Sequence, residues 1–368
     1  MKVLHIISSG GMYGAEAVIL NLSRMLIEDG HSSVIGVFSN SSNPNLQLHE
    51  RATSDGLESH LIPCHGQLDR AAVAAIRELA LRSAADVVHA HGFKADIYAH
   101  LALRGTRVPL VSTCHTWYDN DLLVTLYGKL DRFVLRKFAR VVAVSDEVKN
   151  ILLESGVRAD RICMVHNGID LRPFRGVAPS LRGDGPELLV GLVGRLAREK
   201  GVDVFLAAAA RVLRELPGAR FVVVGEGPDR EKLDRTVDEL KVGENVKMLG
   251  RRDDMPAVYA SLDIMVSSSR QEGLPMAILE GMASGLPLVA SAVGEVPTVV
   301  RDGVTGLLVP ADHVEQLAAG ILELLRDEAK RKRFGAAARK LIEDEYSAER
   351  MTADYLRVYE EAIAAVKQ

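Results

Sequence analysis

Few of the patterns that mark secreted, metal-binding or membrane-spanning proteins occur in this sequence. The three cysteines, Cys64, Cys114 and Cys163, stand apart, and no CxxC pair or metal-ligand spacing is present. Isolated cysteines indicate reduced thiols in a cytosolic protein. The apolar run at 3–7 is too short for a signal peptide, and no stretch approaches the roughly 18 apolar residues of a membrane span. We therefore expect a cytoplasmic protein.

The charge balance and the glycine spacing exclude further classes. With 45 basic and 49 acidic residues the net charge is −4, which gives no general attraction for nucleic acid. Neither half of the chain opens with GxGxxG, so the fingerprint of an NAD-binding enzyme is absent. No short-period repeat is present either, which argues against a solenoid.

Alternating strand and helix patterns run along the chain, and the alternation begins twice. The first series opens with the apolar run Val3–Ile7 and the second with Leu188–Val193, after a segment with prolines and glycines at 172–185. A chain of 368 residues exceeds one hydrophobic core. We therefore predict two α/β domains, each a parallel sheet with helices on both faces. The predicted divisions are 1–175, 176–347 and a long amphipathic C-terminal helix at 348–368.

Candidate ligand-binding residues follow the strands of the first domain. Ligands of doubly wound sheets gather at the carboxyl ends of the strands. Gly10 and Gly11 come after the first strand and would let a ligand approach backbone N–H groups. His91 and His115 come at the ends of two later strands. The alternatives are a tight turn without a ligand and histidines with purely structural hydrogen bonds.

The segment 267–295 predicts an anion site in the second domain. A strand end, a loop with Glu272, and Pro275 lead into a helix that carries Glu280. Proline suits the first turn of a helix, and the free N–H groups of that turn attract anions. A phosphate-binding helix start with two carboxylates suits a nucleotide sugar. The alternative is that both acids only cap the helix or face solvent.

A basic amphipathic helix is predicted at 126–141. Lys129, Arg132, Arg136 and Arg140 recur every three or four residues, opposite an apolar face. Such a helix can lie on an anionic membrane surface. The alternative is a helix packed on the core with a solvated basic face.

Several motifs together carry a resemblance to a known family. They are, in order, Gly10-Gly11, Asn167-Gly168-Ile169-Asp170, Gly194-Arg195-Leu196 with Lys200-Gly201, Gly225-Glu226-Gly227, and Glu272 with seven residues before Glu280. Over nearly its whole length the chain resembles the family-4 retaining glycosyltransferases of the GT-B fold. The resemblance implies two facing Rossmann-like domains with a cleft between them, and a C-terminal helix that crosses back to the N-terminal domain.

The resemblance also implies roles for particular residues. Arg195 and Lys200 would bind the donor diphosphate, Glu272 would face the donor sugar, and Glu280 would accept hydrogen bonds from the ribose. His115 would position the donor sugar and give electrostatic support at the reaction centre. Further donor-binding residues would be Gly10, Gly11, Gly194, Gly227, Arg251, Gly273, Leu274 and Pro275.

No metal or other cofactor is expected, because no DxD motif stands at a suitable strand end. Asp253-Asp254 is predicted to cap a helix instead. The chain departs from the family pattern in the run from Gly294 to Thr298, where Glu295 and Thr298 replace a glycine and a glutamate, and at His166, where a proline is common. The first two departures fall near the expected sugar site.

The predicted function is a retaining, metal-independent transfer of a sugar from a UDP- or GDP-sugar to a hydroxyl. The acceptor would be a saccharide or a lipid-linked molecule in envelope or exopolysaccharide synthesis, and the enzyme would lie in the cytoplasm or on the inner face of the membrane. Two alternatives stay open, a nucleotide-sugar epimerase of the same fold and a non-catalytic protein that binds a nucleotide sugar.

Overall fold

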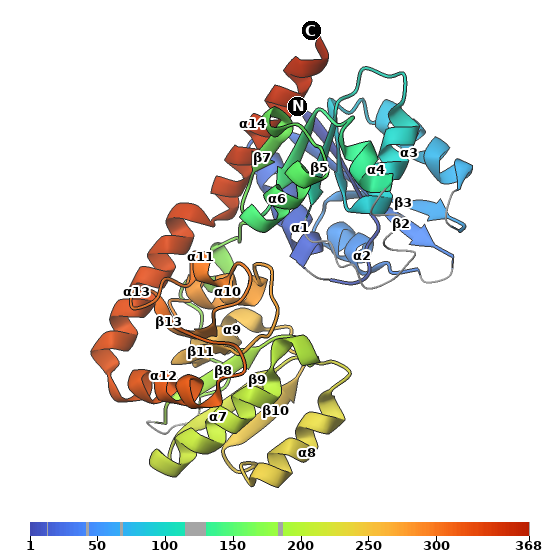
Figure 1. Cartoon of the computed structure of the whole chain (residues 1–368). Helices are drawn as coiled ribbons and strands as arrows, with labels where there is room; N and C mark the ends of the chain where they lie inside the picture. Colours follow the sequence, from blue (N-terminus) through green and yellow to red (C-terminus); the bar gives the residue numbers. More distant parts are fainter. Residues whose placement is uncertain (13, 42–43, 67–68, 115–129, 183–186, 368) are drawn as a thin grey trace. The chain divides into compact units, whose positions relative to one another are not determined.

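The computed structural model describes residues 1–12, 14–41, 44–66, 69–114, 130–182 and 187–367. The chain forms two compact units, which we call unit 1 (Met1–Gly168 with Ala348–Gln368) and unit 2 (Ile169–Ser347) (Figure 1). The first boundary lies a few residues before the expected one, so residues 169–175 belong to unit 2.

Unit 1 is built on a seven-stranded parallel sheet. Its strands are β1 (Lys2–Ile7), β2 (Ser32–Asn40), β3 (Glu58–Cys64), β4 (Val87–His91), β5 (Leu110–Cys114), β6 (Arg140–Ala143) and β7 (Ile162–Met164). They lie in the order β3-β2-β1-β4-β5-β6-β7, and every neighbouring pair is parallel. The order reverses between β1 and β4, which makes their carboxyl ends the switch point of the sheet.

Helices cover both faces of this sheet. They are α1 (Gly14–Glu28), α2 (Gln47–Ser54), α3 (Arg70–Arg82), α4 (Phe93–Leu103), α6 (Asp146–Glu154), the 3-10 turn η1 (Ala159–Arg161) and α14 (Ala348–Lys367). The strands are buried on both sides, so β4 and β5 have no exposed residue, as is typical of parallel strands. One hydrophobic core includes residues of α3 and α4, and another joins α1 to α14.

The C-terminal helix α14 is an integral part of unit 1, although it follows all of unit 2 in the sequence. Its apolar residues pack with those of α1 and the central strands. Its two buried tyrosines also bind the sheet: the hydroxyl of Tyr359 lies 2.8 Å from Nδ1 of His89, and that of Tyr355 lies 2.9 Å from Oγ1 of Thr113. Figure 1 shows this helix, in red, beside the blue and green elements of unit 1.

Unit 2 repeats the design with a six-stranded parallel sheet. Its strands are β8 (Leu189–Val193), β9 (Arg220–Val224), β10 (Val246–Gly250), β11 (Ile264–Ser267), β12 (Leu288–Ser291) and β13 (Gly306–Val309). They lie in the order β10-β9-β8-β11-β12-β13, so the switch point lies between β8 and β11.

The helices of unit 2 also pack on both faces. They are η2 (Arg172–Phe174), η3 (Arg198–Lys200), α7 (Val202–Glu215), α8 (Arg230–Leu240), α9 (Met255–Ser261), α10 (Met276–Ala283), α11 (Val296–Val299), α12 (Val314–Arg326) and α13 (Glu328–Glu345). One core includes residues of α7 and α12, and a second includes residues of α10 and α13. Among the helices that the structure describes, none has the length and apolar content needed to cross a membrane.

The predicted helix at 126–141 is wrong as a continuous element. Within the described residues the helical segment covers 130–135, and Arg140 already belongs to β6. Two of the four cations that defined its basic face form hydrogen bonds with other residues of unit 1. The guanidinium of Arg136 donates to the carbonyl of Ser155, and that of Arg140 donates to Glu361. Lys129 lies outside the described residues.

We predict that Gly335→Ala destabilises unit 2. An added Cβ at this position of α13 would lie 2.0 Å from the carbonyl oxygen of Gly285, and a backbone atom cannot move away as a flexible side chain can. Alanine in a helix normally gains about 1 kcal/mol over glycine. Here we expect a loss of about 1–3 kcal/mol in the free energy of unfolding, measured with urea. Gly218→Ala, where a Cβ meets nothing within 4 Å, is the control; equal stability of the two variants would contradict the prediction.

Candidate functional site

The candidate site of unit 2 is formed by the loops that follow the two switch-point strands. Residues 194–201 follow β8, and residues 268–275 follow β11. Ser268 ties the two loops together, since its hydroxyl donates to the carbonyl of Gly201 at 2.8 Å. This edge of the sheet is where a ligand of a doubly wound fold binds.

Two glycines let the loops pack backbone against backbone. Gly201 and Gly294 have φ angles of 59° and 51°, which favour glycine. An added Cβ at Gly201 would lie 2.0 Å from the carbonyl oxygen of Ser268, and one at Gly294 would lie 1.7 Å from that of Glu272. The loop after β12, which contains Gly294, therefore converges with the other two.

Lys200 and Glu272 meet where these loops converge. The Nζ atom of Lys200 lies 2.5 Å from Oε1 of Glu272, and the hydroxyl of Ser269 donates to the same oxygen at 2.7 Å. The Glu272 side chain is only 8% exposed, so its carboxylate is held in one orientation. Two residues predicted from separate motifs are thus brought together, 72 positions apart in the chain.

The start of α10 offers unpaired backbone donors beside Glu272. Pro275 stands one residue before the helix, at its N-cap position, rather than within its first turn. Within the part of the chain that the structure describes, the amides of Gly273, Leu274 and Met276 have no hydrogen-bond acceptor. Such free amides at a helix start can bind a phosphate group.

Glu280 lies inside α10 and has a partner that the sequence did not indicate. The hydroxyl of Tyr259, in α9, donates to its Oε2 at 2.7 Å. Burial raises the pKa of Glu280, and the hydrogen bond from Tyr259 opposes that shift. No spacing in the sequence pairs the two residues, because their contact depends on the packing of α9 against α10.

Arg270 is a second residue that sequence reasoning missed. Its guanidinium lies 2.9 Å from Asp203 and 2.7 Å from Asp312, and its amide donates to the carbonyl of Glu199. It therefore holds the loop with Glu272 against the start of α7 and against the loop after β13. No motif contains it, because its partners lie far away in the sequence.

The other predicted donor-binding residues line neighbouring loops. The amide of Gly194 donates to the carbonyl of Val224, and the amide of Leu196 to that of Glu226, so the loop with Gly227 lies beside the first loop. The remaining two cations are paired elsewhere, Arg195 with Glu199 and Arg251 with Asp253. Their side chains are 55% and 66% exposed, and no contact with the pair of Lys200 and Glu272 is seen among the described residues.

Asp254 does not have the capping role expected of it. Asp254 stands at the N-cap of α9, but its side chain forms no capping hydrogen bond. It accepts two hydrogen bonds from Arg252, which together with Ser180 lower its pKa, so the predicted cap is wrong. Thr298, one of the departures from the family pattern, donates to the carbonyl of Glu295 at 2.6 Å.

In unit 1 the switch point places Gly10 and Gly11 near the end of β4. Both glycines belong to the loop after β1, where the hydroxyl of Ser9 donates to Glu16 at 2.8 Å and accepts from the amide of Gly11. β4, the neighbour of β1, ends with His91, which is buried. His115 lies outside the described residues.

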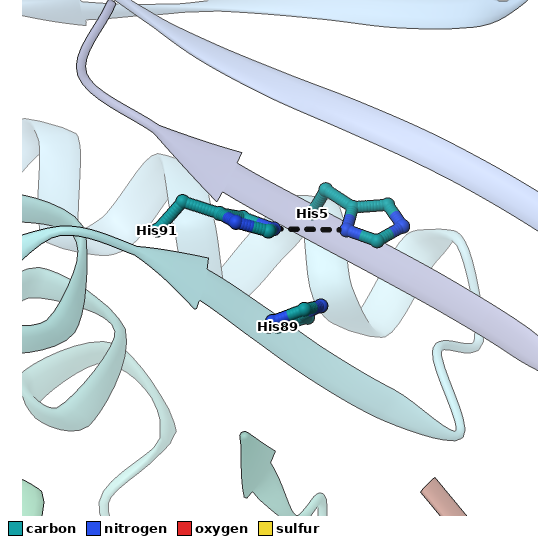
Figure 2. Close-up of side chains that lie close together, drawn as sticks. All are labelled: His5, His89 and His91. Atoms are coloured by element: carbon teal, nitrogen blue, oxygen red, sulfur yellow. Dashed lines mark hydrogen bonds between the residues drawn. The ribbon is translucent and has the colours of Figure 1, made fainter. Parts of the chain in front are cut away.

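Three buried histidines lie together on the neighbouring strands β1 and β4 (Figure 2). They are His5, His89 and His91. Nδ1 of His5 and Nε2 of His91 are 3.1 Å apart, joined by the dashed line in the figure. His89 uses both ring nitrogens, with the hydroxyls of Tyr359 at 2.8 Å and Thr113 at 2.7 Å. An ion bound by all three rings would have to displace these hydrogen bonds. Through Tyr359, His89 therefore joins the sheet to α14.

Comparison with known proteins gives matches over most of the chain. Residues 12–172 match the model described as Glycosyltransferase Family 4, and residues 179–341 match Glycosyl transferases group 1. N-acetyl-alpha-D-glucosaminyl L-malate synthase of Bacillus anthracis is 26% identical over 94% of this chain and 93% of its own. D-inositol 3-phosphate glycosyltransferase of Mycobacterium marinum is 34% identical over 66% of this chain, an alignment that spans 56% of that relative.

Solved structures show the same fold. Anabaena Alr3699/HepE in complex with UDP superposes with a TM-score of 0.83 at 21% identity, over 97% of this chain and 99% of that one. Sucrose-phosphate synthase from Thermosynechococcus elongatus gives a TM-score of 0.80 at 20% identity, over 99% of this chain and all of that one (100%). Fold and matches together define a glycosyltransferase of the GT-B fold. The chain belongs to the family-4 glycosyltransferases, enzymes that transfer sugars, as its motifs predicted.

We predict that His5 makes the protein less stable in acid. Burial lowers the pKa of His5 from 6.5 to about 3, so between these values the unfolded chain binds a proton that the folded chain does not. The free energy of unfolding should therefore fall as the pH drops below 6.5, by about 1.4 kcal/mol per pH unit for one proton. His5→Asn, which keeps a hydrogen-bonding group near Nδ1, should fall less steeply in urea unfolding across a pH series.

The control for that series is His65→Asn, since His65 is exposed. It should keep the slope of the unchanged protein. The same slope in the His5 variant as in the unchanged protein would contradict the prediction.

Proposed function

We propose that this protein is a retaining, metal-independent glycosyltransferase that moves a sugar from a UDP- or GDP-sugar to an acceptor hydroxyl. The contact of Lys200 with Glu272, beside the free amides at the start of α10, carries the proposal. A cation and helix amides suit a diphosphate, and an oriented carboxylate suits sugar hydroxyls. The structural neighbour from Anabaena was solved with UDP and with UDP-glucose, which supports a UDP-linked donor.

Lys200 and Arg195 would stabilise the leaving diphosphate. As the bond from the sugar to the phosphate breaks, negative charge grows on the phosphate oxygens, and fixed cations and amides stabilise that state more than the ground state. Lys200 is already at the site, whereas Arg195 would exchange Glu199 for a phosphate oxygen. The amides of Gly273 and Leu274 would add neutral donors.

The two glutamates would orient the donor. Glu272, fixed by Lys200 and Ser269, would accept hydrogen bonds from sugar hydroxyls. Glu280 would accept from the ribose while Tyr259 holds its other oxygen. Gly194, Gly227 and Arg251 would lie around the base and ribose.

In unit 1, Gly10 and Gly11 would bind the donor, and the role of His115 follows from the family. His115 would position the donor sugar and support charge, rather than act as an obligatory base. With retention of configuration, the acceptor hydroxyl can give its proton to the departing phosphate on the same face of the sugar. The reaction then needs neither a protein base nor a metal ion.

The acceptor we propose is a saccharide or lipid-linked hydroxyl in envelope or exopolysaccharide synthesis. The relatives from Bacillus anthracis and Mycobacterium marinum are named for malate and inositol 3-phosphate, which adds small anionic acceptors to the set that should be tested. Peripheral binding to an anionic membrane is also proposed. Of the cations at 126–141, Arg136 donates to the carbonyl of Ser155 and Arg140 to Glu361.

We predict that Lys200→Ala lowers kcat about 10²- to 10³-fold, because one fixed charge at the leaving group is lost. Nucleotide release from a panel of UDP- and GDP-sugars, with saccharide, lipid-linked, malate and inositol phosphate acceptors, is the measurement. Arg235→Ala, which removes an exposed cation from α8, is the control and should keep full activity.

Three outcomes would count against the proposal. No release of nucleotide with any donor and acceptor would favour a non-catalytic binding protein. Epimerised nucleotide sugar formed without acceptor, detected by NMR, would favour an epimerase. Full activity of the Lys200 variant would remove Lys200 from the reaction.

A further inference from the structure

A basic pocket lies at the amino edge of the unit 1 sheet, where β5 and β6 begin. Its volume is about 380 Å³, and it is lined by the end of α4 with the following loop, the residues before and at the start of β6, η1 and the end of α14. The Gly10–Gly11 loop and the end of β4 lie at the opposite, carboxyl edge of the same sheet. Within unit 1 the pocket is therefore separate from Gly10 and Gly11.

Cations line this pocket, and none of the described residues in its lining is acidic. The cationic side chains are those of Arg104, Lys137, Arg140 and Arg161, with His100 beside them. Glu361 neutralises one of them, Arg140, at 2.9 Å. Burial lowers the pKa of His100, and the nearby charges of Arg104 and Lys137 lower it further, which places three basic groups within electrostatic range of one another.

Two of these cations have no acidic partner in the described part of the chain. Arg104 and Lys137 form no ion pair there, and the ammonium group of Lys137 instead lies 6.0 Å from the ring centre of Phe133. Like charges gathered in a concave site repel one another and raise the local concentration of anions. A bound anion would offset this repulsion between the cations.

The carbonyl groups at the end of α4 do not account for this charge. Carbonyl groups at a helix C-terminus attract cations. At the end of α4, however, Arg77 already donates to the carbonyls of Ala102 and Arg104, and Thr106 donates to that of Leu103. Lys137 and Arg161 come from other segments, and Arg161 binds the carbonyls of Arg136 and Phe138 through one nitrogen only.

We propose that this pocket binds a phosphate-bearing anion. A guanidinium donates paired hydrogen bonds to phosphate oxygens, and an ammonium adds a point charge. Leu103, Phe138 and Val366 supply apolar walls beside the cations. Val366 and the nearby Phe133 are also 38% and 57% exposed, so the surroundings suit the phosphate of a membrane lipid as well as a free phosphate ester.

The test uses the full chain with a double change, Arg104→Gln with Lys137→Gln. Both side chains are exposed, so the variant should fold, which its thermal unfolding will show. The matched control removes two exposed cations from α3, with Arg70→Gln and Arg82→Gln, and changes the net charge equally. The inference does not rest on sugar transfer, and no donor is present in the assay.

Two arms separate the sources of phosphate. In the first, inorganic phosphate and pyrophosphate are titrated and followed by calorimetry. In the second, co-sedimentation is measured with phosphatidylcholine vesicles that contain or lack phosphatidylglycerol. We expect saturable binding in at least one arm, weakened about tenfold or more by the pocket variant and unchanged by the control, since two charged hydrogen-bonding groups are lost.

Binding in the first arm alone would identify a free phosphate or phosphate ester as the ligand. Binding in the second arm, dependent on phosphatidylglycerol, would identify a lipid headgroup. The proposal is overturned if neither arm shows binding, or if the pocket variant and the control lose binding equally, because the effect would then follow net charge.

Discussion

Parallel strand pairing is the constraint on which both units depend. A parallel pair cannot be joined by a tight turn, so each connection crosses over a face of the sheet through a helix or long loop. All strands then end at the same edge, and the loops that follow them collect there. The strand order reverses between β1 and β4 and between β8 and β11, and ligands of doubly wound sheets bind at the carboxyl ends of such strands.

The site of unit 2 shows how this edge becomes rigid. Gly201 and Gly294 allow three loops to pack at backbone distance, and Arg270 ties one of them to two acids on other segments. The pair of Lys200 and Glu272 is then held from several sides. A partly buried ion pair adds little net stability, because desolvation offsets its attraction. In the proposed reaction the pair would supply a charge that is already oriented, and such a charge needs no rearrangement when charge develops on the phosphate.

Helix α14 joins the end of the chain to its beginning. Hydrogen bonds from its tyrosines reach His89 and Thr113 inside the sheet, across as many as 270 positions of sequence. These buried polar groups need their hydrogen-bond partners, because an unpaired hydroxyl or imidazole in the core costs free energy. The network therefore fixes where the helix lies along the sheet.

The sequence by itself determined the elements and their order. Apolar runs and glycine or proline punctuation predicted two α/β domains with parallel sheets, as observed, and the motifs identified the family-4 glycosyltransferases. Local patterns suffice for these features, because they depend on neighbouring residues. The tertiary structure alone decided that the helix predicted at 126–141 ends at 135, that Tyr259 binds Glu280, and that four segments form the basic pocket of unit 1. These depend on contacts between residues far apart in the chain, which only packing brings together.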